Sequence, residues 1–246
     1  MIDTHAHLDA LEEPESALGR ARAAGVTRVI TIGTGIDSCR RALDLTAHDG
    51  VYAALGIDPH QAATPEAARV PELRALLDHP RAVAVGEAGL DYHYGGDAKD
   101  EQRALFAGQL TLASQLGLPI VVHTRAANGD TEAMLRAHDG AVVMHCFSEP
   151  DLLAAGIERG WYFSFAGNAT YPKAGALREA AAAVPADRIP AESDSPYLAP
   201  QPVRGRPNEP AHVVHTVAGL AEARGEDGDE LAARVDANAT AAFRLP

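Results

Sequence analysis

The sequence predicts an α/β fold, a single-domain (β/α)8 TIM barrel that spans residues 1–246. Short apolar segments alternate with longer amphipathic segments along the whole chain, as strands alternate with helices in such folds. Eight of the short segments are apolar almost throughout, which is typical of parallel strands covered on both faces. A length of 246 residues is also common for a barrel of this kind. A doubly wound open sheet is the alternative that this pattern leaves open.

The expected strands are rich in β-branched and other apolar residues and end near glycine or a polar side chain. The second, for example, carries Val29, Ile30 and Ile32 and ends in a Gly-Thr-Gly turn. The eight expected strands are residues 1–7, 26–33, 51–57, 82–87, 120–123, 141–146, 161–165 and 188–192.

The expected helices carry apolar residues at helical spacing and are followed by residues that stop helices. In the first, Ala17, Ala21 and Ala24 share a face, and Gly25 follows. The nine expected helices are residues 14–25, 36–48, 71–78, 97–116, 131–138, 150–159, 174–184, 210–224 and 229–243. The Pro- and Arg-rich run over 200–210 is too short for a domain boundary, so we expect a loop over one end of the fold.

Composition sets the broad class of protein. Hydrophobic residues make up 46% and charged residues 22%, which predicts a folded domain with a full core. The two cysteines, Cys39 and Cys146, and the lack of a signal-peptide pattern favour a reduced, cytoplasmic setting. No apolar run approaches the ~20 residues that span a bilayer, so no membrane association is expected. The net charge of −13 argues against a broad basic surface for duplex nucleic acid.

The first nine residues contain His5 and His7, two positions apart in an expected strand. Alternate residues of a strand point to the same side, so the two imidazoles would lie side by side. Two neutral imidazoles aimed at one point make half of a divalent-metal site. The alternative is a pair of surface histidines near a frayed terminus.

Side chains that bind metal ions recur at the ends of later expected strands. In a parallel barrel all these ends lie on one face, where active sites are built. Any one of these residues alone would more often cap a loop at the end of a strand. Together they predict a site for one or two divalent ions. The candidate ligands are His5, His7, Glu87, His123, His145 and Asp194.

Two of these residues also suit catalysis. The carboxylate of Glu87 can bridge two ions, which an imidazole does not readily do. Asp194 can serve as a ligand and as the general base for a water that lies between the ions. His60, just past the third strand, can contact a phosphate or protonate a leaving group, and Asp91 can orient a ligand. The expected catalytic residues are therefore Asp194, Glu87 and His60.

Other polar residues on the same face are candidates for substrate contact. Arg103, Arg125 and Arg204 can bind a phosphate, whereas Arg206 is expected to be a solvated loop residue. Tyr171 and Tyr197 can stack on a base, and Trp161 is expected in the core. His93 follows the fourth strand and is a weaker candidate than His60. The remaining histidines are expected to be structural: His48, His79, His138, His212 and His215.

Several motifs, taken together, resemble the TatD-type metal-dependent deoxyribonucleases from one end of the chain to the other. They are Thr-His-Ala-His-Leu-Asp at 4–9, Gly-Glu-Ala-Gly-Leu-Asp-Tyr at 86–92, residues 119–125, His-Cys-Phe-Ser at 145–148, Ser-Phe-Ala-Gly at 164–167, Glu-Ser-Asp-Ser-Pro-Tyr-Leu at 192–198 and Asn-Glu-Pro at 208–210. The resemblance implies a TIM-barrel hydrolase of the amidohydrolase superfamily with the six ligands named above. His60 matches a family histidine near the site, and Glu192 matches a family glutamate.

The chain departs from the family pattern at three positions. Asp58 stands where the family usually has histidine, Ser193 replaces threonine, and Glu149 replaces glycine. None of these changes removes an expected ligand. Asp58 adds negative charge close to His60, where an anionic substrate would lie.

The first hypothesis for function is hydrolysis of phosphodiester bonds in DNA by a metal-activated water. The resemblance implies a deoxyribonuclease, with 3′–5′ exonuclease action on single-stranded ends as the specific form. The ions are Mg²⁺, Mn²⁺ or Zn²⁺, because histidine ligands favour Zn²⁺ or Mn²⁺ and the resemblance favours Mg²⁺. The alternative is hydrolysis of an amide, an ester or aminoacyl-tRNA at the same centre. A non-catalytic, metal-binding assembly partner is a third hypothesis, and no obligate protein partner is expected.

Overall fold

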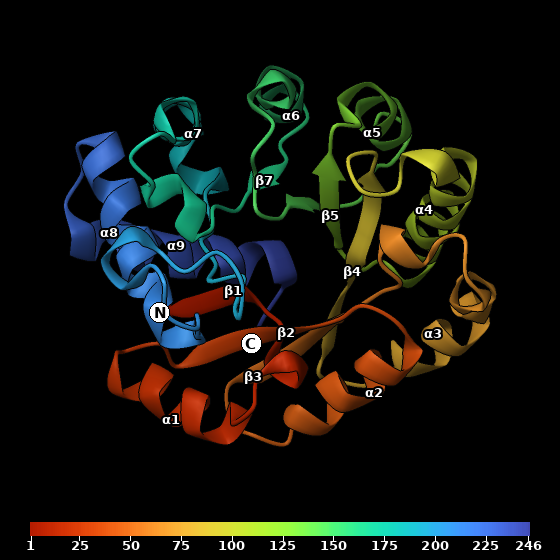
Figure 1. Ribbon diagram of the computed structural model, residues 1–246, viewed down its shortest axis with the longest axis horizontal. Helices are drawn as coiled ribbons and strands as arrows, with labels where there is room; N and C mark the ends of the chain where they lie inside the picture. The colour runs from red at the N-terminus through yellow and green to blue at the C-terminus, as the bar shows by residue number, and fades with distance from the viewer.

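Seven parallel strands form one sheet in chain order in the computed structural model, which describes residues 1–246 (Figure 1). Each strand pairs in parallel with the next. All carboxyl-terminal strand ends therefore lie at the same edge. The strands are β1 (Ile2–Ala6), β2 (Arg28–Gly33), β3 (Val51–Leu55), β4 (Ala82–Asp91), β5 (Ile120–Arg125), β6 (Val142–Met144) and β7 (Tyr162–Phe163).

The segment after β7 joins the two edges of this sheet. Ala191 forms a parallel bridge with Phe165, and Ser195 forms one with Ala6. The N–H of Thr4 also donates to the carbonyl of Ala191 at 3.2 Å. The segment thus contacts both the β7 side and the β1 side through its backbone, so the expected (β/α)8 barrel is confirmed.

The eighth strand itself is less regular than expected. No continuous strand forms over 188–192, which corrects the sequence-based assignment. Pro190 has no N–H to donate to a ladder. Asp194 has a φ of 54°, in the left-handed region that extended strands do not use. The bridges are therefore isolated, and the irregular backbone carries Asp194 at the edge where the strands end.

The nine expected helices are all present and lie around the strands (Figure 1). They are α1 (Pro14–Ala23), α2 (Ile36–Leu45), α3 (Val70–Leu76), α4 (Lys99–Leu116), α5 (Asn128–Leu135), α6 (Leu153–Glu158), α7 (Gly175–Ala183), α8 (Val213–Arg224) and α9 (Gly228–Phe243). Their ends differ from the expected ends by a few residues, where short 3-10 turns continue into loops. None of the helices combines the length and apolarity needed to cross a membrane.

Alternate residues of the strands pack into two separate cores, as the two faces of a pleated strand require. In β2, Val29 belongs to the outer cluster, which also contains helix residues, whereas Ile30 and Ile32 belong to an inner cluster. Ala242 and Phe243 from the end of α9 complete the inner cluster. Helix α9 therefore packs against the interior residues of the strands, at the end opposite the polar strand ends.

The first strand contains an irregularity that decides where its histidines point. Ile2 belongs to the inner cluster and Ala6 to the outer cluster, although strict alternation would put both on one face. The pairing with β2 shifts register between Asp3 and Ala6, so one extra residue lies in β1. His5 and His7, which flank Ala6, therefore face the interior side.

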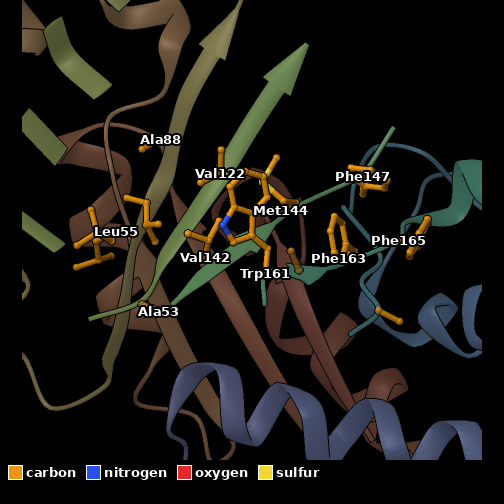
Figure 2. Close-up of a cluster of buried hydrophobic side chains, with 14 of the residues drawn as sticks. Ala53, Leu55, Ala88, Val122, Val142, Met144, Phe147, Trp161, Phe163 and Phe165 are labelled. Carbon is orange, nitrogen blue, oxygen red and sulfur yellow. The ribbon is translucent and has the colours of Figure 1, made fainter. Parts of the chain in front are cut away.

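The outer cluster also fixes the region of His145. Trp161 is buried, as expected, and the rings of Phe147 and Phe163 meet edge to face at 4.8 Å (Figure 2). Met144, before His145, and Phe147, two residues after it, are both buried. Packing on both sides thus holds the backbone that presents this imidazole.

Candidate metal centre

Six side chains from five parts of the chain meet at the carboxyl-terminal edge of the sheet. One set, which we call the β1 group, consists of His5, His7 and Asp194. The Nε2 atoms of His5 and His7 are 3.3 Å apart. Asp194 Oδ1 is 3.8 Å from Nε2 of His5 and 3.5 Å from Nε2 of His7. Three donor atoms therefore face one small volume.

The second set, the β5–β6 group, consists of His123 and His145. Nδ1 of His123 and Nε2 of His145 are 3.3 Å apart. Glu87 Oε1 is 2.9 Å from Nδ1 of His123 and 3.2 Å from Nε2 of His145. The other oxygen, Oε2, is 3.5 Å from Nε2 of His5 and 3.9 Å from that of His7. Glu87 thus directs one oxygen at each group.

Glycines on either side of Glu87 allow β4 to run close to β5. Gly89 pairs with His123 and has a φ of 143°. A Cβ atom at Gly89 would lie 1.9 Å from the carbonyl oxygen of His123, which no other residue could accommodate. A Cβ at Gly86 would similarly lie 2.6 Å from the carbonyl oxygen of Val121. The Gly-Glu-Ala-Gly motif is therefore required by this close packing.

Two buried carboxylates orient the imidazoles of the β5–β6 group. Asp91 Oδ2 is 3.2 Å from Nε2 of His123, and Glu192 Oε1 is 3.2 Å from Nδ1 of His145. Each imidazole donates an N–H to its carboxylate, which leaves its other nitrogen free to face Glu87. His5 differs, because its Nδ1 is buried without a hydrogen-bond partner.

The ionisable side chains of the centre strongly shift one another's pKa values. Burial alone would raise the pKa of Glu87, but the charge of His145 and the hydrogen bond from His123 hold it well below its usual value. Burial would lower the pKa of His145, but Glu87 and Glu192 hold it well above its usual value. Burial, with the charge of His145, lowers the pKa of His5 to about 3. Protons and divalent cations therefore compete for the same nitrogen atoms beside an ionised Glu87.

The donor set fits divalent cations. Imidazole nitrogen with carboxylate oxygen is a typical environment for Zn²⁺ or Mn²⁺, and Mg²⁺ can use a few carboxylates with water at its other positions. The second carboxylates behind His123 and His145 are also typical of metal-binding histidines. Two overlapping sets have their donor atoms within 4.8 Å of one another: His5, Glu87 and His145, and His5, His7 and Asp194.

A family model described as TatD related DNase matches residues 2–244. The chain belongs to the TatD-related DNase family. It is a hydrolase of that family, as the sequence predicted, and the resemblance stated from its motifs is confirmed.

Individual relatives cover nearly the whole chain. An uncharacterized metal-dependent hydrolase TatD from Mycobacterium tuberculosis is 39% identical and aligns with 100% of this chain and 98% of its own length. A 3′-5′ ssDNA/RNA exonuclease TatD from Pantoea vagans is 37% identical, over 94% of this chain and 93% of its own. The crystal structure of YjjV, a TatD homologue from Escherichia coli K12, superposes with a TM-score of 0.93 at 30% identity and covers 100% and 98% of the two chains.

His60, expected to contact a phosphate or protonate a leaving group, lies at the rim of the centre in a short 3-10 turn, η2 (Pro59–Gln61). Its Nε2 is 3.3 Å from Asp91 Oδ2, and its Nδ1 is 3.8 Å from Asp58 Oδ2. Its ring centre is 6.0 Å from that of His123, so it stands next to the β5–β6 group. The Asp58 carboxylate, absent from the usual family pattern, thus faces His60 directly.

The expected arginines have different surroundings. Arg125 lies with its guanidinium 4.7 Å from the ring centre of Tyr94, and Arg204 lies 3.9 Å from that of Tyr171. Arg103 instead pairs with Asp130 at 2.9 Å and also with Asp100. Its charge is neutralised by these two carboxylates, so the expected phosphate contact by Arg103 finds no support.

Sequence reasoning missed Asp3, which is fully buried at the start of β1. Its carboxyl accepts the N–H and the hydroxyl of Ser193 at 2.8 and 2.5 Å, and the N–H of His5 at 3.3 Å. Asp3 thus ties β1 to the segment that carries Asp194. A carboxyl inside an otherwise apolar strand, two residues before His5, was the signal that could have found it.

Two further polar side chains, the buried Gln102 and the partly buried Glu149, hold the loops behind the centre. Gln102 of α4 pairs with both the N–H and the carbonyl of Asp91, at 2.8 and 2.9 Å. Glu149, at the position of the family glycine, accepts the N–H of Ala126 and the side-chain amide of Asn128. The loops after β4 and β5 are fixed by these contacts.

Proposed function

We propose that this chain is a two-metal exonuclease that hydrolyses phosphodiester bonds at single-stranded nucleic-acid ends, with His5, His7, Glu87, His123, His145 and Asp194 as ligands. The observation that carries the proposal is the division of Glu87, whose oxygens face two different pairs of imidazoles. A carboxylate shared in this way is suited to two neighbouring cations. When bound, such ions acidify a water and neutralise charge on a phosphoryl oxygen.

The residues of the chain then have separate tasks. Glu87 and the imidazoles hold the charged centre in place, and the carboxylates of Asp91 and Glu192 fix the tautomers of His123 and His145. Asp194, whose Oδ1 faces the imidazoles of His5 and His7, accepts the proton of the attacking water.

His60 is the proposed proton donor to the leaving oxygen. The carboxylate of Asp58 and, more weakly, that of Asp91 raise its pKa above the usual value against the opposing effect of burial. The imidazole is therefore more often protonated near neutral pH than a free histidine. It is also partly exposed at the rim, where a leaving group can reach it.

Single-stranded ends are proposed because a net charge of −13 does not favour binding to the phosphates of a duplex. Relatives named 3′-5′ ssDNA/RNA exonuclease, from Pantoea vagans and Klebsiella pneumoniae, are 37% and 33% identical to this chain. This sequence similarity supports the same class of substrate and the same direction of cleavage, from the 3′ end.

The test is cleavage of a single-stranded oligonucleotide labelled at its 5′ end, in Mg²⁺ or Mn²⁺. We expect a ladder shortened from the 3′ end, and loss of activity in Glu87→Gln and Asp194→Asn. Glu72→Gln is the matched control, because Glu72 is a surface glutamate that pairs with Arg40 and Arg69 and with none of the six candidate ligands. Full cleavage by Glu87→Gln, or none by the wild-type protein, would contradict the proposal.

Acyl hydrolysis remains a second candidate because of one observation. Asp58 places a carboxylate 3.8 Å from Nδ1 of His60, which opposes an anionic phosphate at that side of the site. Robust turnover of amide or ester substrates by metal-loaded protein, without oligonucleotide cleavage, would favour this candidate. Asp58→His removes the carboxylate that favours this candidate, so it should then allow oligonucleotide cleavage.

A further inference from the structure

Two large aromatic side chains are strongly exposed, and both stand beside the candidate metal centre. Tyr94 is 69% exposed and Tyr197 is 57% exposed, whereas the other large apolar side chains are at least partly covered. The ring centre of Tyr197 is 5.6 Å from that of His7, at an angle of 72°. The ring centre of Tyr94 is 6.3 Å from that of His60. Their exposure is thus concentrated at the rim of one site.

The two tyrosines lie next to different halves of the centre. Tyr197 lies against His7 of the β1 group. Tyr94 lies against His60, whose ring is 6.0 Å from that of His123 in the β5–β6 group. One exposed ring therefore stands on each side of the shared carboxylate of Glu87.

Backbone hydrogen bonds hold the main chain that carries both rings next to the centre. The N–H of Tyr197 donates to the carbonyl of Asp194 at 2.8 Å. The N–H of Tyr94 donates to Oδ1 of Asp91 at 2.8 Å, while the other oxygen of Asp91 faces His123. With the main chain held in this way, a ligand that binds has only the rotation of each side chain to order, which limits the conformational entropy lost.

A guanidinium group lies over the ring of Tyr94. The guanidinium of Arg125, at the end of β5, lies 4.7 Å from the ring centre of Tyr94. It covers part of the ring, and most of the Tyr94 side chain is still exposed to solvent. An aromatic face next to a guanidinium matches the base and phosphate of one nucleotide.

We propose that Tyr197 and Tyr94 are stacking platforms for two bases of a single strand, one on each side of the bond that is hydrolysed. This inference rests on the proposed exonuclease function and deepens it by naming how the substrate is recognised. Bases inside a duplex have both faces covered by their neighbours, so only unpaired nucleotides can stack here. Stacking also allows a chain with a net charge of −13 to hold nucleic acid with few phosphate contacts.

The test compares an intact single-stranded oligonucleotide with one that lacks the bases of its two terminal nucleotides. On the intact oligonucleotide, Tyr197→Ala and Tyr94→Ala should each raise KM about tenfold and leave kcat nearly unchanged, because stacking holds the strand without entering the chemistry. Tyr197→Phe and Tyr94→Phe keep the ring and are the matched controls, with KM close to wild type. On the abasic oligonucleotide, all five proteins should have the same raised KM.

Equal KM values for the alanine variants and the wild type on the intact oligonucleotide would overturn the stacking assignment, as would an equal rise on both oligonucleotides. If the wild-type protein cleaves neither, the proposed function fails, and stacking is judged by fluorescence anisotropy on a labelled oligonucleotide with phosphorothioate ends. Weaker binding by the alanine variants but not by the phenylalanine variants is then the supporting result. Equal binding by all five, or none, overturns the inference.

Discussion

The two halves of the candidate centre are built in different ways. In the β5–β6 group, each imidazole is oriented by a buried carboxylate, Asp91 or Glu192. In the β1 group, Nδ1 of His5 has no partner, and Asp194 lies on an irregular segment held by backbone bridges. One half is thus positioned by side-chain hydrogen bonds and the other by the closure of the barrel. We expect the two halves to respond differently to mutation.

Glu87→Ala should have the largest effect, because it removes the one residue that faces both halves. We expect metal content per chain to fall at both positions and the rate of oligonucleotide cleavage to drop on the order of 10³-fold or more. Elemental analysis of the purified protein and a single-turnover assay measure these two effects. Unchanged metal content would show that Glu87 is not shared.

Glu192→Ala should act on the β5–β6 group alone. Loss of the partner of a metal-binding histidine typically lowers affinity about 10- to 100-fold, so we expect one ion to be lost to a competing chelator and the other retained. Glu72→Ala is the matched control, since Glu72 is an exposed glutamate that pairs with Arg69. Loss of both ions together would mean that the two halves are one cooperative unit.

Asp3→Ala should weaken the β1 group through the fold rather than through a ligand. It leaves the buried N–H of Ser193 without its acceptor and removes one of the two acceptors near the Ser193 hydroxyl, at a cost of about 1–3 kcal/mol of unfolding free energy. Asp3→Asn keeps one acceptor and should cost less. Denaturant unfolding of the metal-free proteins measures both, and equal stability of wild type and Asp3→Ala would contradict the role of Asp3 in closing the barrel.

The smallest expected effect lies outside both halves, at His138, which follows α5. Burial lowers the pKa of His138, so the unfolded chain takes up its proton first as the pH falls. Stability from this group is fully present above the unfolded pKa near 6.5 and is lost as the pH falls towards the folded value. The unfolding free energy of the wild type should therefore fall slightly more between pH 7.5 and pH 5 than that of His138→Gln. An identical decrease in both proteins would contradict this.

Much of the architecture follows from local patterns. The apolar runs and helix stops predict every helix and seven strands to within a few residues, because burial on both faces of a parallel strand leaves a continuous apolar signal. The eighth strand could not be predicted in detail. Its backbone is shaped by Pro190 and by the left-handed Asp194, and its pairing depends on Ala6 and Phe165, far away in the chain.

The sequence by itself determined the kind of chemistry, because six donor side chains at strand ends converge in any parallel barrel. Only the tertiary structure decided which atoms face each other. The register shift in β1 turns His5 and His7 inward, and the buried Asp91 and Glu192 select the nitrogen that His123 and His145 present. Such choices depend on contacts between residues distant in the chain, and local sequence patterns carry no information about them.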